Sequence, residues 1–251
     1  MEANEAIELF LKPYEQDKNI QAAILTGSYV FGNQNKYSDI DIFIISSDEM
    51  NWRERGNKII SGYLIEYFIN PSRIILQEIE NPVKSVTAVI VANGKKLFDK
   101  SGILKILSEK AREKLNTPIK SLDERSKEMA KYFMNYYYEQ LSRAYENNSN
   151  EFMFLYYTFL EHIIYSYSDF CGLILPPKTK IYQYVSDEKY VLSNYLDKIK
   201  DKMFLELLSN CMKQNTHEIM YKNITEIKKY LMNLFGEFNI DGWKIRSEIN
   251  V

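Results

Sequence analysis

The chain has 251 residues, of which 45% are hydrophobic and 26% are charged, and its formal net charge is −2. This apolar fraction suffices for one large domain or two of ordinary size, and the nearly neutral charge argues against a broad face that binds extended nucleic acid. Cys171, Cys211, His162 and His217 lack the paired spacing of a zinc site, so we expect two free thiols.

The first half of the chain alternates predicted helices and strands. Its predicted elements are a helix over 4–16 that Pro13 ends or bends, strands over 20–26 and 40–45, a helix over 49–56, a strand hairpin of 58–61 and 63–69 around Gly62, a helix from Pro71 to 80, a second hairpin of 86–91 and 96–98 around Asn93-Gly94, and a helix over 103–114.

The second half contains only predicted helices. They cover 122–146, capped by Ser121, then 151–171, ended by Gly172, and then 178–185, 187–212 and 216–235. We therefore predict an α+β protein, in which residues 1–117 form a small mixed β-sheet domain and residues 118–251 form a helical bundle.

Polar residues cluster where the first two predicted strands meet. Gly27-Ser28 follows one apolar strand, and Asp39 and Asp41 open the next. Side chains alternate across a strand, so the two carboxylates share a face, about 6 to 7 Å apart along the chain. Such oxygen ligands suit Mg²⁺, and the free N–H groups of a short helix beginning at Ser28 would point at an anion that Gly27 lets approach. The pattern predicts phosphoryl-type chemistry on a nucleoside triphosphate.

The order of these residues resembles the nucleotidyltransferase superfamily, which includes DNA polymerase β and the aminoglycoside nucleotidyltransferases. The shared features are an apolar strand, Gly27-Ser28, a gap of ten residues, and Ser38-Asp39-Ile40-Asp41. The candidate for the family's third carboxylate is Glu66, which lies in an apolar strand where an unpaired charge is costly; the alternative is a strand-edge Glu that faces water.

One feature departs from the family pattern. Many minimal members carry an Arg shortly after the Gly-Ser pair, where this chain has Tyr29, Val30 and Phe31.

The resemblance implies a mechanism and roles for these residues. Asp39, Asp41 and Glu66 would bind two Mg²⁺ ions and act in catalysis, while Gly27, Ser28 and Ser38 would bind ATP or another nucleoside triphosphate. A hydroxyl of the acceptor would attack the α-phosphorus, and pyrophosphate would leave in line.

The helical half offers further candidates. The resemblance to the kanamycin nucleotidyltransferase type implies a catalytic Glu on the first helix of the second domain and a basic phosphate-contacting residue one turn later. Glu139 and Arg143 match this spacing. The same spacing is also that of an ordinary surface ion pair on a helix. Glu161, beside His162, is the competing candidate base. Lys178 is expected either to contact the triphosphate or simply to be solvated.

Tyrosine is abundant in the same half of the chain. We expect these residues to pack in the core and at domain interfaces, with an aromatic pocket for base or acceptor as the alternative. They are Tyr132, Tyr136, Tyr137, Tyr138, Tyr156, Tyr157, Tyr165 and Tyr167.

The leading prediction is an enzyme that transfers AMP to a hydroxyl of a small molecule such as an aminoglycoside or lincosamide antibiotic. The alternatives are a protein or tRNA acceptor, as in minimal nucleotidyltransferases paired with toxin partners, and a catalytically silent nucleotide sensor. Residues 1–12 do not resemble a signal peptide, and no apolar run approaches the ~20 residues that span a bilayer, which predicts a cytoplasmic protein without a membrane partner. A homodimer is expected if the Tyr-rich helix faces exceed what one bundle can bury.

Overall fold

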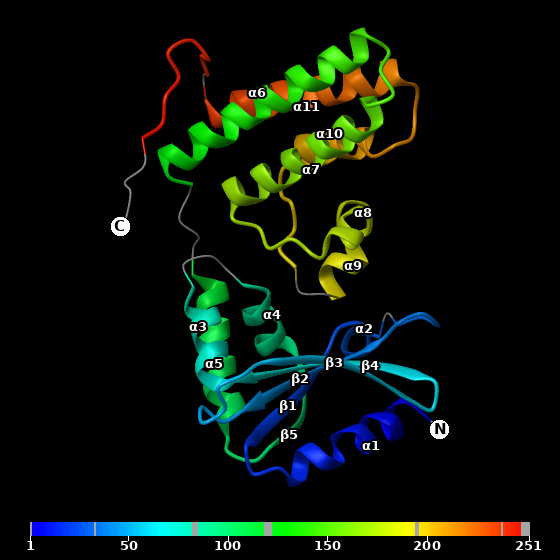
Figure 1. Ribbon diagram of the computed structural model, residues 1–251, viewed down its shortest axis with the longest axis vertical. Coiled ribbons are helices and arrows are strands. Elements are labelled where there is room, and N and C mark those ends of the chain that lie inside the picture. The colour runs from blue at the N-terminus through cyan, green and yellow to red at the C-terminus, as the bar shows by residue number, and fades with distance from the viewer. Residues whose placement is uncertain are drawn as a thin grey trace. The chain divides into compact units, whose positions relative to one another are not determined.

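The computed structural model describes residues 2–32, 34–81, 85–117, 122–193, 196–236 and 238–246. The chain forms two compact units, one of Met1–Ile119 with Leu192–Leu196 and the other of Lys120–Val191 with Asp197–Val251. The first contains a mixed sheet with helices, and the second is helical in the residues described, which confirms the predicted α+β class (Figure 1). Among the residues described, no helix is both long and apolar enough to pass through a bilayer.

The first unit contains a five-stranded sheet and five helices in the residues described. In chain order its elements are α1 (Ala3–Gln16), β1 (Ile20–Thr26), α2 (Ser28–Phe31), β2 (Ile40–Ser46), β3 (Glu54–Ile60), β4 (Tyr63–Pro71), α3 (Ser72–Glu80), α4 (Val86–Asn93), β5 (Lys95–Asp99) and α5 (Ile103–Asn116). Helix α1 continues through Pro13, which therefore does not end it.

The sheet has the strand order β3-β4-β2-β1-β5, in which β2 and β4 are parallel and the other neighbours are antiparallel. Helix α1 packs on one face, and α3, α4 and α5 pack on the other (Figure 1). Strand β2 is central, so Ile40, Ile42 and Ile44 enter the core beneath α1, while Phe43 and Ile45 enter the opposite core. This double burial anchors the strand that carries Asp41.

The predicted helix over 49–56 is wrong, because residues 54–60 form strand β3. Asp48 does not start a helix there. Its carboxylate instead accepts hydrogen bonds from the Ser72 hydroxyl and the Arg73 backbone N–H, both at 2.7 Å, at the beginning of α3. The predicted hairpin around Gly62 is confirmed, with a longer first strand than expected.

The predicted strand over 86–91 is also wrong, because Val86–Asn93 forms helix α4. The Ser85 hydroxyl caps the helix by accepting the Ala88 N–H at 3.2 Å. Ala88 and Val91 are buried against the sheet and α5. Burial of this apolar segment therefore overrides the strand preference of its β-branched residues. The return strand β5 pairs with β1 instead.

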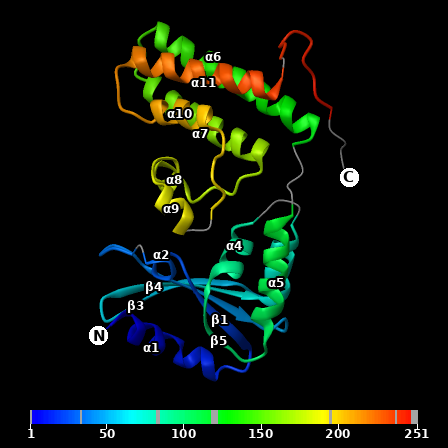
Figure 2. The same ribbon diagram turned by 180° about the vertical axis from the view of Figure 1, so that it is seen from behind.

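The second unit is built on four longer helices, α6 (Glu124–Glu146), α7 (Phe152–Cys171), α10 (Lys202–Cys211) and α11 (His217–Phe235), with η1 (Lys178–Lys180), α8 (Ile181–Ser186) and α9 (Glu188–Ser193) between them (Figure 2). Asp123 caps α6, and the predicted cap Ser121 lies outside the described residues. The single helix predicted over 187–212 is divided into α9 and α10.

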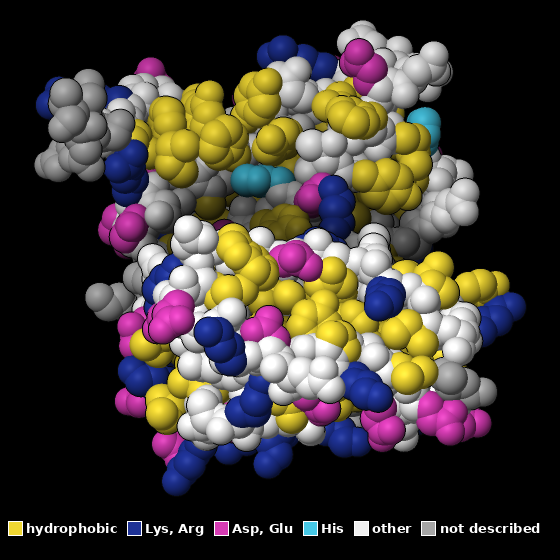
Figure 3. Space-filling view, turned by 60° about the horizontal axis from the view of Figure 1, so that its bottom comes forward, with side chains coloured by type: hydrophobic (Ala, Val, Ile, Leu, Met, Phe, Trp, Pro, Cys, Tyr) yellow, Lys and Arg dark blue, Asp and Glu magenta, His cyan; other side chains and the backbone are white. Residues whose placement is uncertain are grey.

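Several of the tyrosines pack between these helices. Tyr156 is fully buried and donates to the Cys211 carbonyl at 2.7 Å, and the rings of Tyr167 and Phe204 stack. Between α6 and α11, the Tyr138 hydroxyl lies 3.1 Å from Thr225 Oγ1 and 3.2 Å from the Tyr221 hydroxyl. These residues serve the core, whereas others remain at the surface, where apolar side chains gather on the visible face of this unit (Figure 3).

Candidate active site

Three carboxylates meet at one end of the sheet. Asp39 lies directly before β2, Asp41 is its second residue, and Glu66 lies on β4. The parallel pairing sets Asp41 opposite Glu66 in register. Each of the three residues is half-buried, and one oxygen atom from each lies within 4.8 Å of the other two. The residues predicted to bind metal are therefore brought together by the fold.

The backbone of Gly27 lies close against the Asp41 carboxylate. Its φ of +69° is a backbone conformation that L side chains rarely adopt, and a Cβ added there would lie 2.0 Å from Asp41 Oδ2. The turn after β1 thus approaches the carboxylate so closely that only a residue without a side chain fits.

The three carboxylates repel one another. Burial, followed by the charges of Asp39 and Glu66, raises the pKa of Asp41 to about 7, and the charge of Arg55 opposes this rise. A cation among the three oxygens would relieve this repulsion, and carboxylate oxygens are the ligands that Mg²⁺ and similar hard cations prefer. The residues present therefore fit a divalent metal ion.

Arg55 is a site residue that the sequence did not reveal. Its guanidinium donates to Glu66 Oε1 from Nε at 2.9 Å and from a terminal nitrogen at 2.5 Å. It also lies over the Phe68 ring, 4.9 Å from the centroid. Residues 49–56 were predicted to be helical, so no strand pairing placed Arg55 near Glu66. Cross-strand neighbours in the β3–β4 hairpin would have been the signal for this contact.

The loop between α2 and β2 holds the remaining predicted residues. Ser28 is the first residue of α2, as predicted, with Gly27 at its N-cap. The Ser38 hydroxyl accepts the Asn35 N–H at 2.9 Å and so closes the turn before Asp39. Burial, with the Tyr63 and Asp39 charges, raises the pKa of Tyr29, which keeps this phenol protonated beside the carboxylates.

Comparison with known proteins assigns this unit to a family. Residues 7–103 match the model of the polymerase β nucleotidyltransferase family, and this match includes all three carboxylates and Gly27. This part of the chain belongs to the nucleotidyltransferase superfamily. The chain is also similar to the crystal structure of a nucleotidyltransferase-like protein from Exiguobacterium sibiricum, with 10% sequence identity, coverage of 93% of this chain and 75% of that chain, and a TM-score of 0.49. No curated protein matches the chain.

Tyr29, Val30 and Phe31 follow Gly27-Ser28, so this part of the chain lacks the Arg that the resemblance led us to look for there. Arg55 of β3 is a cation that this domain does place at the carboxylates. Its side chain is 68% exposed. The guanidinium is therefore held by Glu66 but can leave it without opening the core.

The predicted residues of the second unit have the following surroundings. Glu139 and Arg143 lie on α6 and form an exposed pair with a separation of 4.0 Å. Glu139 also accepts from the Asn135 amide at 3.0 Å. Lys178 lies in η1, and its ammonium lies 2.5 Å from the Glu161 carboxylate. Glu161, the predicted alternative base, is therefore ion-paired with the Lys178 ammonium.

His162, beside Glu161, is partly buried between α6 and α7. Burial lowers the pKa of its imidazole, and its ring packs against Phe133 and Tyr137 of α6. Ser166 Oγ lies 3.3 Å from its Nε2 atom. These contacts give His162 a structural role between α6 and α7.

Proposed function

We propose that the protein transfers a nucleoside monophosphate, AMP, from MgATP to a hydroxyl of a small molecule and releases pyrophosphate. The observation that carries this proposal is the cluster of Asp39, Asp41 and Glu66, whose oxygen atoms lie within 4.8 Å of one another in a nucleotidyltransferase domain. An aminoglycoside or lincosamide antibiotic is the proposed kind of acceptor.

The three carboxylates would hold two Mg²⁺ ions. When bound, these ions lower the pKa of the acceptor hydroxyl and neutralise charge on the leaving pyrophosphate. Asp41 must be ionised to serve as a metal ligand. Because its pKa is raised to about 7, binding of the metal would release the proton of this carboxyl group. Arg55 holds Glu66 through Oε1, so metal binding at that oxygen would displace the guanidinium and leave it available for a phosphate oxygen.

The backbone around Gly27 and the hydroxyl groups of Ser28 and Ser38 would hold the triphosphate. With reactants held in place, catalysis is mostly positioning and electrostatic stabilisation. Glu139 as general base and Arg143 as a phosphate contact belong to the same proposal, whereas Lys178, also predicted as a phosphate contact, is paired with Glu161.

The helical second unit supports a small-molecule acceptor. Minimal nucleotidyltransferases that modify proteins or tRNA lack a long appended bundle, whereas this chain carries α6, α7, α10 and α11 after its sheet domain. Such a unit provides surface for recognising an acceptor of limited size.

The test is pyrophosphate release from MgATP in the presence of a panel of aminoglycosides and lincosamides. The Asp39→Ala, Asp41→Ala double variant should abolish acceptor-dependent release, because it removes two of the three ligands. Glu80→Ala is the matched control, since it removes an exposed carboxylate of the same unit that pairs with Lys110.

The outcomes separate the alternatives. Release that depends on one acceptor and is retained in the control supports the proposal. Binding of MgATP without release for any small acceptor refutes the small-molecule acceptor and directs the search to protein and tRNA. Failure to bind Mg-nucleotide at all refutes the metal site.

A further inference from the structure

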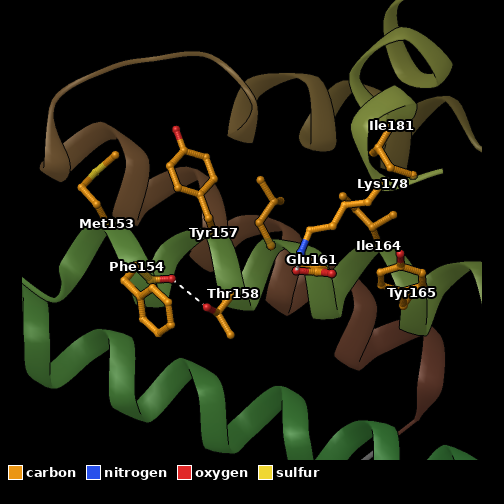
Figure 4. Close-up of a pocket in the computed structure, with 10 residues that line it drawn as sticks. Met153, Phe154, Tyr157, Thr158, Glu161, Ile164, Tyr165, Lys178 and Ile181 are labelled. Atoms are coloured by element: carbon orange, nitrogen blue, oxygen red, sulfur yellow. Dashed lines mark hydrogen bonds and ion pairs between the residues drawn. The ribbon is translucent and has the colours of Figure 1, made fainter. Parts of the chain in front are cut away.

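The second unit has a pocket of about 490 Å³ on the outer face of α7 (Figure 4). Helix α7 buries large side chains on its inner face, yet its outer face also carries large apolar groups. Phe154 is 76% exposed, Tyr157 is 50% exposed and Tyr165 is 40% exposed, and all three line the pocket. Ile181 of α8 lines it as well. A contiguous apolar concavity of this size is typical of a small-molecule site.

Charge in this pocket is confined to one place. Among the described residues that line it, the charged ones are Glu161 and Lys178, which form an ion pair at 2.5 Å. Tyr157, Glu161 and Tyr165 are spaced four residues apart, so the carboxylate lies between two tyrosines on one face of α7 (Figure 4). A carboxylate flanked by aromatic rings is suited to bind an organic cation.

We propose that this pocket binds an amphipathic small molecule with an apolar body and one amine, whose ammonium replaces that of Lys178 at Glu161. The apolar body would lie against Phe154, Ile164 and Ile181. The aromatic rings of Tyr157 and Tyr165 would face the ammonium group.

The two partners of the ion pair differ in exposure and in the element that carries them, which favours a cationic ligand over an anionic one. Glu161 lies in the middle of the long helix α7, and its side chain is 36% exposed. Lys178 lies in a short 3₁₀ turn after Pro176-Pro177, and its side chain is 69% exposed on a flexible stem. The carboxylate is therefore the fixed partner, and the lysine ammonium is the one that a ligand can displace.

For an acceptor that binds in this pocket, the lining also narrows the chemical class within the proposed antibiotics. A single carboxylate among apolar walls suits an amphipathic monoamine better than a polycation such as an aminoglycoside, which needs several acidic groups. This choice of acceptor class rests on the proposed function, whereas the proposal that the pocket binds an amine does not.

The experiment uses the full chain and dansylcadaverine, a fluorescent probe with an aromatic body and one primary amine. Its fluorescence should rise saturably on binding, and the neutral N-acetylated probe should bind about tenfold more weakly or worse, since it lacks the charge. Glu161→Gln should weaken binding of the amine by about tenfold and leave the acetylated probe unaffected. Lys178→Ala should tighten binding of the amine, because it removes the internal competitor.

Matched controls are available in the same unit. Glu188→Gln and Lys198→Ala disrupt an exposed ion pair outside the pocket and should leave probe binding unchanged. Thermal unfolding of each variant checks that it is folded.

Two results would overturn the inference: equal binding of the amine and the acetylated probe, or weaker binding of the amine to Lys178→Ala. The titration contains no nucleotide, so its outcome is independent of transfer. If the probe binds as expected but no acceptor is modified, the proposed function fails and the pocket stands. If an acceptor is modified but Glu161→Gln binds the amine probe as tightly as wild type, the inference about the pocket is refuted and the proposed function is retained.

Discussion

Replacing Gly27 by Ala should weaken metal binding, an effect that is separate from its cost in folding stability. The substitution adds one methyl group at the turn after β1. That group would lie 2.0 Å from Asp41 Oδ2, whereas real Cβ atoms essentially never come nearer than 3.0 Å to another heavy atom. The Asp41 carboxylate must therefore shift by about 1 Å from its place among the three carboxylates.

The expected magnitudes have two parts. Gly27 has a φ of +69° and a ψ of −156°, a backbone conformation essentially confined to glycine, so holding an Ala there costs about 1–3 kcal/mol of folding stability. A displacement of about 1 Å at the metal ligands should lower the rate of transfer about 10²-fold. A 10²-fold loss of rate corresponds to about 2.7 kcal/mol, so activity and stability change by similar amounts and the control variant must separate the two effects.

The assay is Mn²⁺ binding followed by electron paramagnetic resonance, combined with urea unfolding. Gly236→Ala is the matched control, because Gly236 also combines a positive φ (+100°) with an extended ψ (173°), and nothing lies within 4 Å of its added Cβ. Both variants should lose similar stability, but only Gly27→Ala should leave Mn²⁺ free. Normal Mn²⁺ binding by Gly27→Ala would refute the close fit between the turn and Asp41.

Four further predictions concern the charged residues. The contribution of Asp41 to the stability of the metal-free protein should fall as the pH rises from 3.8 to about 7. The reason is that the pKa of Asp41 is raised in the folded state, which keeps a proton that the unfolded chain has already released. Urea unfolding should show this decrease in the free energy of unfolding for wild type and not for Asp41→Asn. At pH 8 without metal, Asp41→Asn should be about 1 kcal/mol more stable than wild type in the same assay, because it relieves repulsion, and it should not bind Mn²⁺; lower stability would contradict this account. Arg55→Ala should bind Mn²⁺ more tightly, because the guanidinium no longer competes for Glu66, and weaker binding would show that Arg55 assists the metal. Glu139→Gln should change the free energy of unfolding by less than about 0.5 kcal/mol, since its pair with Arg143 is exposed; kcat should fall about 10²-fold if Glu139 is the base and stay unchanged if the pair is only a surface contact.

The sequence alone predicted the part of the site that depends on local geometry. Gly27-Ser28 between two apolar strands indicated a strand, a turn and a short helix, and the structure has β1, Gly27 and α2 there. Alternation along β2 placed Asp41 opposite in direction to Ile40 and Ile42, which enter the core beneath α1. These features follow from spacing within a few residues, so no tertiary information was needed.

Contacts between distant segments were decided by the tertiary structure. Glu66 was recognised as a candidate by its charge in an apolar strand, but its position opposite Asp41 depends on the parallel register of β2 and β4. Arg55 was missed because the residues around it were predicted to form a helix, and the pairing of β3 with β4 is what makes them a strand. Cross-strand register cannot be determined from spacing along one segment.

The segment 86–93 shows the same limit in the core. Its β-branched residues favour a strand, yet it forms α4, because Ser85 caps the helix and Ala88 and Val91 are buried against the sheet and α5. Intrinsic preference amounts to a few tenths of a kcal/mol per residue, and burial of a whole apolar face outweighs it. The sequence therefore determined the local chemistry of Asp39 and Asp41, whereas packing and strand pairing decided which distant side chains complete the site.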